Sequence, residues 1–447
     1  MAVDTAASSP SAPWYRSLDR SQWYTLLASN LGWLFDGYEV YALILTVGVA
    51  LHQLLAPDHY AQIPAYAGTI IAITLFGWGV GGMIGGILAD YIGRKRTMML
   101  AILAYSLLTG LSAVAWSWMS FAALRFLVGI AIGSEWATGA SITAELWPDK
   151  ARGRGAGLMQ CGLGIGFFIA SALWVYFGGL GPNGWRWMFL LGVVPGLCTL
   201  WIRTSIPESP AWERTREARR EATERKRSGR ALSAADQALT RFTLHEVVAE
   251  PKLRMRLLLV FLMSLATTLA WWAIATFVPP YVASVAVKAG QSGPTWAAYG
   301  GMAYNAGAIA GYIGLGFFAD IFGRRPVTLV FFALSLIMTP VLYWWTHDLT
   351  LLLVVTVVNG FFTLGLYSWM PVWMPELFPT AVRATGMAFA FNTPRFIAFL
   401  GPLVAGTLIG TLGFGNTAVY FSLIYIVGFI AALFLPETNG QPLPETI

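Results

Sequence analysis

Two acidic residues, Asp36 and Glu39, lie inside an otherwise apolar run from about Trp23 to Ala50. An acidic side chain near the centre of a bilayer costs about 2.5 to 3.5 kcal/mol on insertion scales, so it normally faces a partner or a wet cavity. Residues three apart on a helix are about 60° apart around its axis, which lets both carboxyls face one cavity. Because carboxylates this close resist double ionisation, at least one should hold a proton near neutral pH, as a proton carrier requires. The alternative is a structural carboxylate that a neighbouring Trp or Tyr satisfies.

Arg125 lies in another apolar run, 120–145, and is expected at the same depth. At about 1.5 Å per residue, Asp36 and Glu39 lie about 18 and 22 Å from the inner end of their helix, and Arg125 about 8 Å from the outer surface. In a hydrocarbon core about 30 Å thick, the three groups share one level. Arg125 would favour the ionised carboxylate and burial the protonated one, so alternating access could switch between these environments. A purely structural buried ion pair is the alternative.

Arg395 and Asn392 flank Pro394 in the run 387–409 and are the candidate substrate site. A guanidinium group beside a helix break is suited to bidentate recognition of a carboxylate, unless the side chain extends inward to the membrane surface. Aromatic residues with a few amides are typical of small-molecule pockets, although any single Trp is more often a packing residue. The further candidates for the lining are Tyr38, Gln160, Trp271, Trp272, Tyr304, Asn305, Asn359 and Tyr367.

The elements that must position these residues are predicted membrane helices. The chain has 447 residues, of which 57% are hydrophobic and 11% charged, a composition typical of a polytopic membrane protein. Each of twelve apolar runs is long enough to cross about 30 Å of hydrocarbon. They lie at about 24–50, 67–89, 97–116, 120–145, 156–177, 186–202, 257–281, 297–318, 326–345, 349–370, 387–409 and 417–435.

Two segments repeat at a spacing of about 230 residues, which indicates a duplicated six-helix unit. GGMIGGILADYIGRKRT and GYIGLGFFADIFGRRPV align Asp90 with Asp320 and Arg94 with Arg324. AELWPDKARGRGAG and PELFPTAVRATGMA align Glu145 with Glu376 and Arg152 with Arg383. Parallel repeats related by an axis along the membrane normal place the substrate site between the halves. We therefore expect an all-α membrane protein with a first bundle at 1–202, a linker at 203–255 and a second bundle at 256–447.

The linker is polar on every face and sets Glu221 four residues before Arg225, so we expect a solvated helix and not a second domain. Most of the 28 lysines and arginines fall in segments on the linker's side of the membrane, which predicts cytoplasmic N- and C-termini. The net charge of +6 then faces anionic lipid headgroups and does not require nucleic acid. The two Cys and four His have no metal-ligand spacing, and no nucleophile or phosphate loop is present. We expect no metal, no cofactor and no enzyme activity.

The repeated G-x-x-x-D-x-x-G-R-[KR] loop, with Arg125, Gly129 and Gly133 in an R-x-x-x-G-x-x-x-G pattern, resembles the major facilitator superfamily. GSEW, GWRWMF, IPESPAW, ELFPTAVRATG and LPETNGQPLPE look like the sugar porters and related metabolite:proton symporters. DGYE at 36–39 is similar to the sialate/lactate and aromatic-acid branches.

This resemblance implies twelve helices in two pseudo-symmetric bundles and pairs Asp36 with Arg125 for proton coupling. It gives Glu135, of the GSEW motif, a role in either gating or coupling. It also implies that the charged repeat residues form a cytoplasmic gate, although they could simply set topology and cap helix ends. These are Asp90, Arg94, Glu145, Arg152, Asp320, Arg324, Glu376 and Arg383.

The expected function is proton-coupled symport of a small organic anion across the cell inner membrane by alternating access. Arg395 would bind the substrate and Asp36 or Glu39 would carry the proton. The carboxylate could be lactate-like, aromatic or sialic. The alternatives are a sugar porter of the same fold, a proton-driven drug or metabolite exporter, and a non-transporting membrane sensor. Membrane lipid and a proton are the other expected partners, and the protein is expected to be a monomer.

Overall fold

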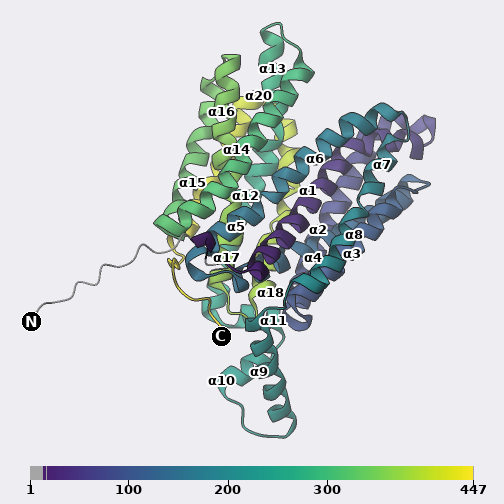
Figure 1. Ribbon diagram of the computed structural model, residues 1–447. Helices are drawn as coiled ribbons and strands as arrows, with labels where there is room; N and C mark the ends of the chain where they lie inside the picture. Colours follow the sequence, from purple (N-terminus) through teal and green to yellow (C-terminus); the bar gives the residue numbers. More distant parts are fainter. Residues whose placement is uncertain (1–13, 17, 446–447) are drawn as a thin grey trace, which may run out of the picture.

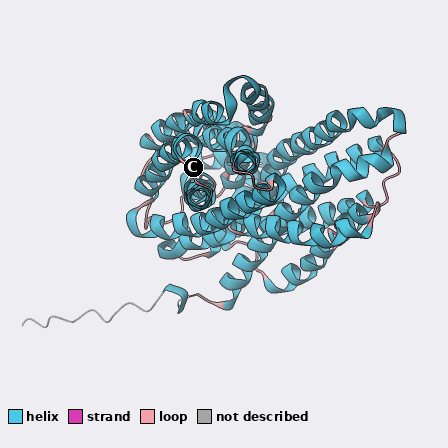
Figure 2. Cartoon of the chain, turned by 90° about the horizontal axis from the view of Figure 1, so that it is seen from above, coloured by secondary structure: helices cyan, strands magenta, loops and turns pink. Residues whose placement is uncertain are grey.

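The computed structural model describes residues 14–16 and 18–445, and these residues form helices and short loops without a β-strand. Figure 1 shows two helical bodies that meet at the end where the connecting segment lies and diverge toward the opposite end. We call the end where the two bodies meet the linker end. Seen from above, the helices of each body gather into a bundle (Figure 2). The all-α fold predicted from the sequence is confirmed.

The first half begins with α1 (Arg20–Leu54), whose 35 residues are more than enough to cross a bilayer. Its start is fixed by a capping box, in which the Asp19 side chain accepts a hydrogen bond from the Gln22 N–H at 2.8 Å. The other elements are η1 (Trp14–Arg16), η2 (Pro57–Gln62), α2 (Ile63–Ile92), α3 (Arg94–Ser112), α4 (Trp118–Leu146), η3 (Asp149–Ala151), α5 (Arg152–Gln160), α6 (Gly162–Phe177), η4 (Gly178–Leu180), α7 (Gly184–Leu191) and α8 (Val194–Ser205).

The second half begins with α12 (Pro251–Ile274), five residues before the predicted boundary at 256. Its membrane helices are interrupted more often than those of the first half. One interruption lies near Pro394, because proline cannot donate the helical hydrogen bond. The remaining elements are η5 (Ala275–Phe277), α13 (Val278–Lys288), α14 (Gly293–Phe322), α15 (Arg324–Pro340), η6 (Val341–Trp345), α16 (Leu349–Thr363), η7 (Gly365–Ser368), α17 (Trp369–Leu377), α18 (Arg383–Asn392), α19 (Arg395–Ala398), α20 (Leu400–Ser422) and α21 (Ile424–Leu433).

Each of the twelve predicted membrane runs falls mainly on helix. Within the described residues, nine helical stretches are long and apolar enough to span a membrane on their own. The other three predicted runs are 97–116, 186–202 and 387–409. They coincide with the short helix α3, the pair α7 and α8, and the interrupted series α18 to α20.

The linker contains α9 (Pro210–Arg227), α10 (Ala234–Thr240) and α11 (Thr243–Ala249). The predicted Glu221–Arg225 pair is present at 3.1 Å. The expectation of a solvated surface on every face was wrong, because the Trp212 side chain is buried and its indole N–H donates to the Asp90 carbonyl at 3.1 Å. Arg219 donates to the carbonyl of Asp90 in the first half at 2.8 Å and to that of Ala381 in the second half at 3.0 Å. The linker therefore touches both halves.

Glycines allow the two halves to meet closely at the linker end. A Cβ added at Gly86 of α2 would lie 2.2 Å from the Cβ of Ala388 in α18. A Cβ at Gly316 of α14 would lie 2.3 Å from the carbonyl oxygen of Gly153 in α5. These two contacts occupy corresponding places in the duplicated halves, and neither leaves room for a side chain.

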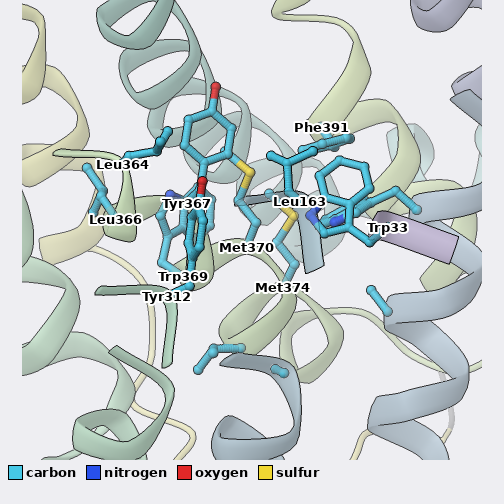
Figure 3. Packing of buried hydrophobic residues seen from close by; sticks show 14 of the residues in the cluster. Trp33, Leu163, Tyr312, Leu364, Leu366, Tyr367, Trp369, Met370, Met374 and Phe391 are labelled. Carbon is cyan, nitrogen blue, oxygen red and sulfur yellow. The ribbon is translucent and has the colours of Figure 1, made fainter. Parts of the chain in front are cut away.

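On the side of these glycine contacts that faces away from the linker end, an aromatic layer fills the space between the halves. The rings of Trp136 (α4) and Phe391 (α18) stack with their centroids 3.8 Å apart. Trp33 of α1 lies 6.2 Å from Phe391, and Figure 3 shows this pair packed beside Met370 and Met374. Because α1 runs away from the linker end, Trp33 lies nearer to that end than Asp36 and Glu39 do. The layer thus separates the carboxyl groups from the linker end.

Candidate functional site

A cavity of about 220 Å³ lies between the two halves. Its walls are mainly aromatic and aliphatic, and the Tyr41 and Phe167 rings stack in it with centroids 4.6 Å apart and 26° between their planes. Polar groups come from Asn305, Thr276 and Tyr304, whose hydroxyl lies 2.9 Å from that of Thr363. The lining residues are Val40, Tyr41, Ile44, Phe167, Trp271, Trp272, Ala275, Thr276, Pro279, Gly301, Tyr304, Asn305 and Leu364.

Four of the eight predicted lining residues border this cavity: Trp271, Trp272, Tyr304 and Asn305. The other four lie elsewhere. Tyr38 donates its hydroxyl to the Met188 carbonyl at 2.7 Å, and Gln160 accepts from the Trp136 indole at 3.4 Å. Asn359 is buried and accepts from the Thr363 hydroxyl at 3.3 Å, while Tyr367 packs edge-on against Trp271 at 5.6 Å.

The structure also places Tyr41 and Phe167 in the cavity, which the sequence reading missed. A signal was available for Tyr41, because Val40, Tyr41 and Ile44 lie three and four residues apart on one face of α1. Phe167 had no such signal, since its helix is apolar on all sides.

Arg125 pairs with Glu39, not with Asp36, so the pairing implied by the family resemblance was wrong. Its Nη1 donates to Glu39 Oε1 at 3.1 Å, and its Nη2 donates to the Ser112 hydroxyl at 2.6 Å. Glu39 Oε1 also accepts from the hydroxyl of Thr109. Both side chains are at most 2% exposed, so each group is the buried counterion of the other.

This ion pair borders a second, smaller hollow of about 20 Å³. Val40, Ile44 and Trp272 line both this hollow and the main cavity, so the two spaces adjoin. Trp78 of α2 closes its other side. The Glu39–Arg125 pair therefore lies next to the space where a substrate would bind.

Asp36 faces Glu135, and their carboxyl groups lie within hydrogen-bonding reach of each other. Both residues are at most 1% exposed, and no donor among the described residues reaches any of their four carboxyl oxygens. Gly32, one turn before Asp36, makes room, because a Cβ there would lie 2.2 Å from Glu135 Oε1. Two carboxylates in contact without a counterion repel strongly, whereas one proton held between them satisfies both groups.

Arg395 lies close to this pair but does not border the main cavity. Its guanidinium group stands 4.7 Å from the Trp78 ring and 4.0 Å from the Phe391 ring. Its Nη1 donates to the Phe391 carbonyl and, at 3.3 Å, to Asn392 Oδ1, as expected for neighbours at a helix break. The positive charge of Arg395 acts on Asp36. The Trp78 ring thus contacts Arg395 and also lines the smaller hollow.

At the linker end, each half places one arginine between two carboxylates. Arg94 lies 3.0 Å from Asp90 and 3.1 Å from Glu145, and Arg324 lies 2.8 Å from Asp320 and 2.9 Å from Glu376. All six side chains are almost completely buried. The matching geometry agrees with the repeat found in the sequence.

The same carboxylates connect the two halves. Glu145 of the first half accepts from Arg383 of the second, and Arg152 of the first half lies 2.8 Å from Glu376 of the second. Asp320 accepts from the backbone N–H groups of Gly153 and Arg154, each at 2.9 Å. In the reciprocal contact, Asp90 accepts from the Thr385 N–H at 2.9 Å and from its hydroxyl at 2.7 Å. All eight predicted gate residues thus belong to two four-residue networks, each of which spans both halves, and we call the two networks together the linker-end cluster.

Two further acidic residues support this cluster, and the sequence reading missed them. Glu208 accepts from the N–H groups of Arg94 and Lys95, at 3.0 and 3.2 Å, and Glu437 accepts from those of Arg324 and Arg325, each at 3.0 Å. A carboxylate at a helix N-terminus satisfies free N–H groups and complements the helix dipole. Gly93 and Gly323 permit this approach through φ angles of 109° and 101°. The signal was a repeated Pro-Glu pair after the last helix of each half.

Known proteins resemble this chain over nearly its whole length. The sequence matches the family described as Sugar (and other) transporter over residues 31–446. The sialic acid transporter NanX of Escherichia coli K12 is 28% identical over 424 residues, covering 93% of this chain and 96% of NanX. The cis,cis-muconate transport protein of Acinetobacter baylyi is 29% identical over 422 residues, covering 93% of this chain and 95% of that protein. The structure of the proton:xylose symporter XylE shares the fold, with a TM-score of 0.75 at 20% identity over 95% of this chain and 98% of XylE.

Proposed function

We propose that this chain, which belongs to the Sugar (and other) transporter family of the major facilitator superfamily, imports a small carboxylate together with a proton. The family consists of membrane transporters, so the chain is a multi-pass membrane transporter and not an enzyme. The substrate class and the proton coupling are the proposal.

The contact between Asp36 and Glu135 carries this proposal. Removing one partner from a buried charge pair costs about 3 to 5 kcal/mol, and this carboxyl pair has no ion-pair partner at all among the described residues. Because two buried charged carboxylates without a counterion would cost this much free energy, we infer that the pair binds a proton. It lies beside Arg395 and one helical turn from Glu39, where a bound anion would alter its electrostatics.

Charge balance gives the number of protons. The central ionisable groups are the carboxyls of Asp36, Glu39 and Glu135 and the guanidinium groups of Arg125 and Arg395. They are neutral together when the Asp36–Glu135 pair holds one proton. A monoanionic substrate makes this region negative, and a second proton on the pair restores neutrality. We infer that one proton enters with each monoanion.

The main cavity favours a flat, apolar body on the carboxylate. Stacked and tilted aromatic rings line it, and planar molecules gain most from such contacts. Relatives named for cis,cis-muconate and for sialic acid support a carboxylate substrate. We assign the carboxylate to Arg395, which Asn392 orients, and the apolar body to the cavity. Arg395 does not border the cavity in the conformation shown, so this binding requires the Trp78 ring, which contacts Arg395 and lines the smaller hollow, to move.

We propose that the linker end faces the cytoplasm, because most basic residues lie there. In the conformation shown, the linker-end cluster closes this side while the halves diverge at the other (Figure 1). Substrate and proton would enter from outside, and breaking the cluster would release them inside. The Asp36–Glu135 pair borders neither central hollow, so a proton on it is shielded while the cluster is closed.

The experiment for this function is an uptake screen in liposomes with an acidic exterior. We expect aromatic or unsaturated monocarboxylates to be taken up, and Arg395→Gln to raise their KM about tenfold or more, since hydrogen bonds to charged groups contribute about 1.5 to 3 kcal/mol. Arg220→Gln is the control, because it makes the same change on an exposed linker residue whose side chain is 80% accessible. Uptake of xylose or lipophilic cations without any carboxylate would contradict the proposal and favour the sugar-porter or exporter alternative.

A further inference from the structure

A hollow of about 600 Å³ lies on the second half at the linker end, where α12 and α15 begin and α21 ends. We call it the basic hollow. It is separate from the central cavity and from the linker-end cluster, and shares no lining residue with either. Its walls are Pro251, Lys252, Met255, Arg256, Leu259, Arg325, Leu433, Phe434, Leu435 and Pro436.

Three of these wall residues are cations, Lys252, Arg256 and Arg325, and none is acidic. They come from two helices far apart in the sequence, so the fold brings their charges together. Two carboxylates adjoin the wall residues in the chain, those of Glu250 and Glu437. The Glu437 carboxylate is engaged by the N–H groups of residues 324, 325, 438 and 439. Arg256 donates Nη1 to the Leu377 carbonyl at 2.8 Å, which fixes its guanidinium group at the edge of the hollow.

The other wall of the basic hollow is apolar and open. Phe434 is 72% exposed and Met255 is 55% exposed, although both lie at the ends of membrane helices. The exposed apolar surface continues away from the linker end through Leu258 of α12 and Ile430 of α21. A soluble anion would contact only the hollow, whereas a lipid would place its headgroup in the hollow and its acyl chains on this surface.

We propose that the basic hollow binds an anionic phospholipid, with its phosphate against Lys252, Arg256 and Arg325 and its acyl chains along α12 and α21. Basic pockets between membrane helices at the membrane surface are suited to such headgroups. The combination of three cations with an adjoining apolar track matches a molecule that is anionic at one end and apolar at the other. Bound lipid would hold the starts of α12 and α15 together, next to α17, which carries Glu376.

The test is native mass spectrometry of the purified chain after equilibration with phosphatidylglycerol or phosphatidylcholine. We expect at least fivefold more phosphatidylglycerol to be retained, and the double variant Lys252→Gln/Arg325→Gln to remove most of this preference. Arg256 is left in place because it also supports the fold. The control is Arg16→Gln/Arg20→Gln, which removes two exposed cations at the start of the first half; it should retain the lipid like the wild type.

Three outcomes would overturn the proposal. The first is equal retention of the two lipids, and the second is an equal loss of preference in the control variant, which would indicate general surface charge. The third is displacement of the lipid by inorganic phosphate at millimolar concentration, which would indicate a phosphate site without an acyl track. Thermal unfolding of each variant without added lipid checks that the fold is intact, and charge reversal by Lys252→Glu provides a second test if the double variant unfolds.

Discussion

Replacing Asp36 with asparagine is expected to abolish uphill accumulation of the substrate under an imposed pH difference, while exchange of substrate at equal pH continues. Asparagine has nearly the same size, but it leaves only Glu135 to bind a proton, so the pair can no longer alternate between one and two protons. One pH unit supplies about 1.4 kcal/mol to a symporter that moves one proton, which corresponds to about tenfold accumulation. We therefore expect the accumulation ratio to fall from about ten to about one, measured with radiolabelled substrate in liposomes.

The matched control is Thr46→Val, a change of similar size at a fully buried position in α1, where the hydroxyl donates to the Ala42 carbonyl of its own helix. It should leave accumulation unchanged. The double variant Asp36→Asn/Glu135→Gln should behave like Asp36→Asn alone, because residues that act as one unit have non-additive effects. Continued concentration of substrate by Asp36→Asn would show that this pair does not carry the coupled proton.

Replacing Gly86 with valine is expected to lower transport at least tenfold by preventing the halves from closing at the linker end. A Cβ at Gly86 would already overlap Ala388, and the backbone of α18 cannot retreat without breaking the bonds from Thr385 to Asp90. The measurement is hydrogen exchange of the N–H groups that bridge the halves, those of Gly153, Arg154 and Thr385. These should exchange faster in the variant.

Gly68→Val is the control for this prediction, since a Cβ at Gly68 on the same helix would meet nothing within 4 Å. It should retain both transport and slow exchange. If Gly86→Val instead transports like Gly68→Val, close approach at the linker end is not needed for the cycle. Size-exclusion chromatography of each variant in detergent checks that its fold is intact.

The fold was predictable because two independent signals agreed. Apolar runs of membrane length define the helices, and the repeated Asp-Gly-Arg and Glu-Arg motifs define the two halves. The linker-end cluster followed from the same repeat, since charges at helix ends are visible in a sequence. The support from Glu208 and Glu437 did not, because each follows the last helix of its half and reaches a helix N-terminus more than a hundred residues earlier in the chain.

The partners of the two central carboxyls could not be predicted, for a geometrical reason. Asp36 and Glu39 differ by about 4.5 Å in height and about 60° around the helix, and a depth estimate from helix ends is no finer than that. Which one meets Arg125 depends on how α1 is rotated against α4. The structure shows that Gly32, one turn before Asp36, leaves room for Glu135 beside α1, while Glu39 meets Arg125.

The lining of the cavity was only half predictable for a related reason. Trp271, Trp272, Tyr304 and Asn305 were found because polar or aromatic groups are uncommon on apolar helices. Asn359 and Gln160 have the same character, yet they satisfy the hydrogen bonds of Thr363 and Trp136 inside the bundles. Residue type alone does not distinguish a side chain that faces a cavity from one that faces a neighbouring helix.

The most direct test of the account is to measure proton and charge movement in the same liposomes during substrate uptake. A pH-sensitive dye inside the liposomes and radiolabelled substrate give the ratio of protons to monoanions, and a clamped membrane potential gives the net charge. The account predicts one proton per monoanion and an uptake rate independent of the potential, because the Asp36–Glu135 pair alternates between one and two protons. Uptake without acidification of the interior, or uptake driven by the potential alone, would contradict it.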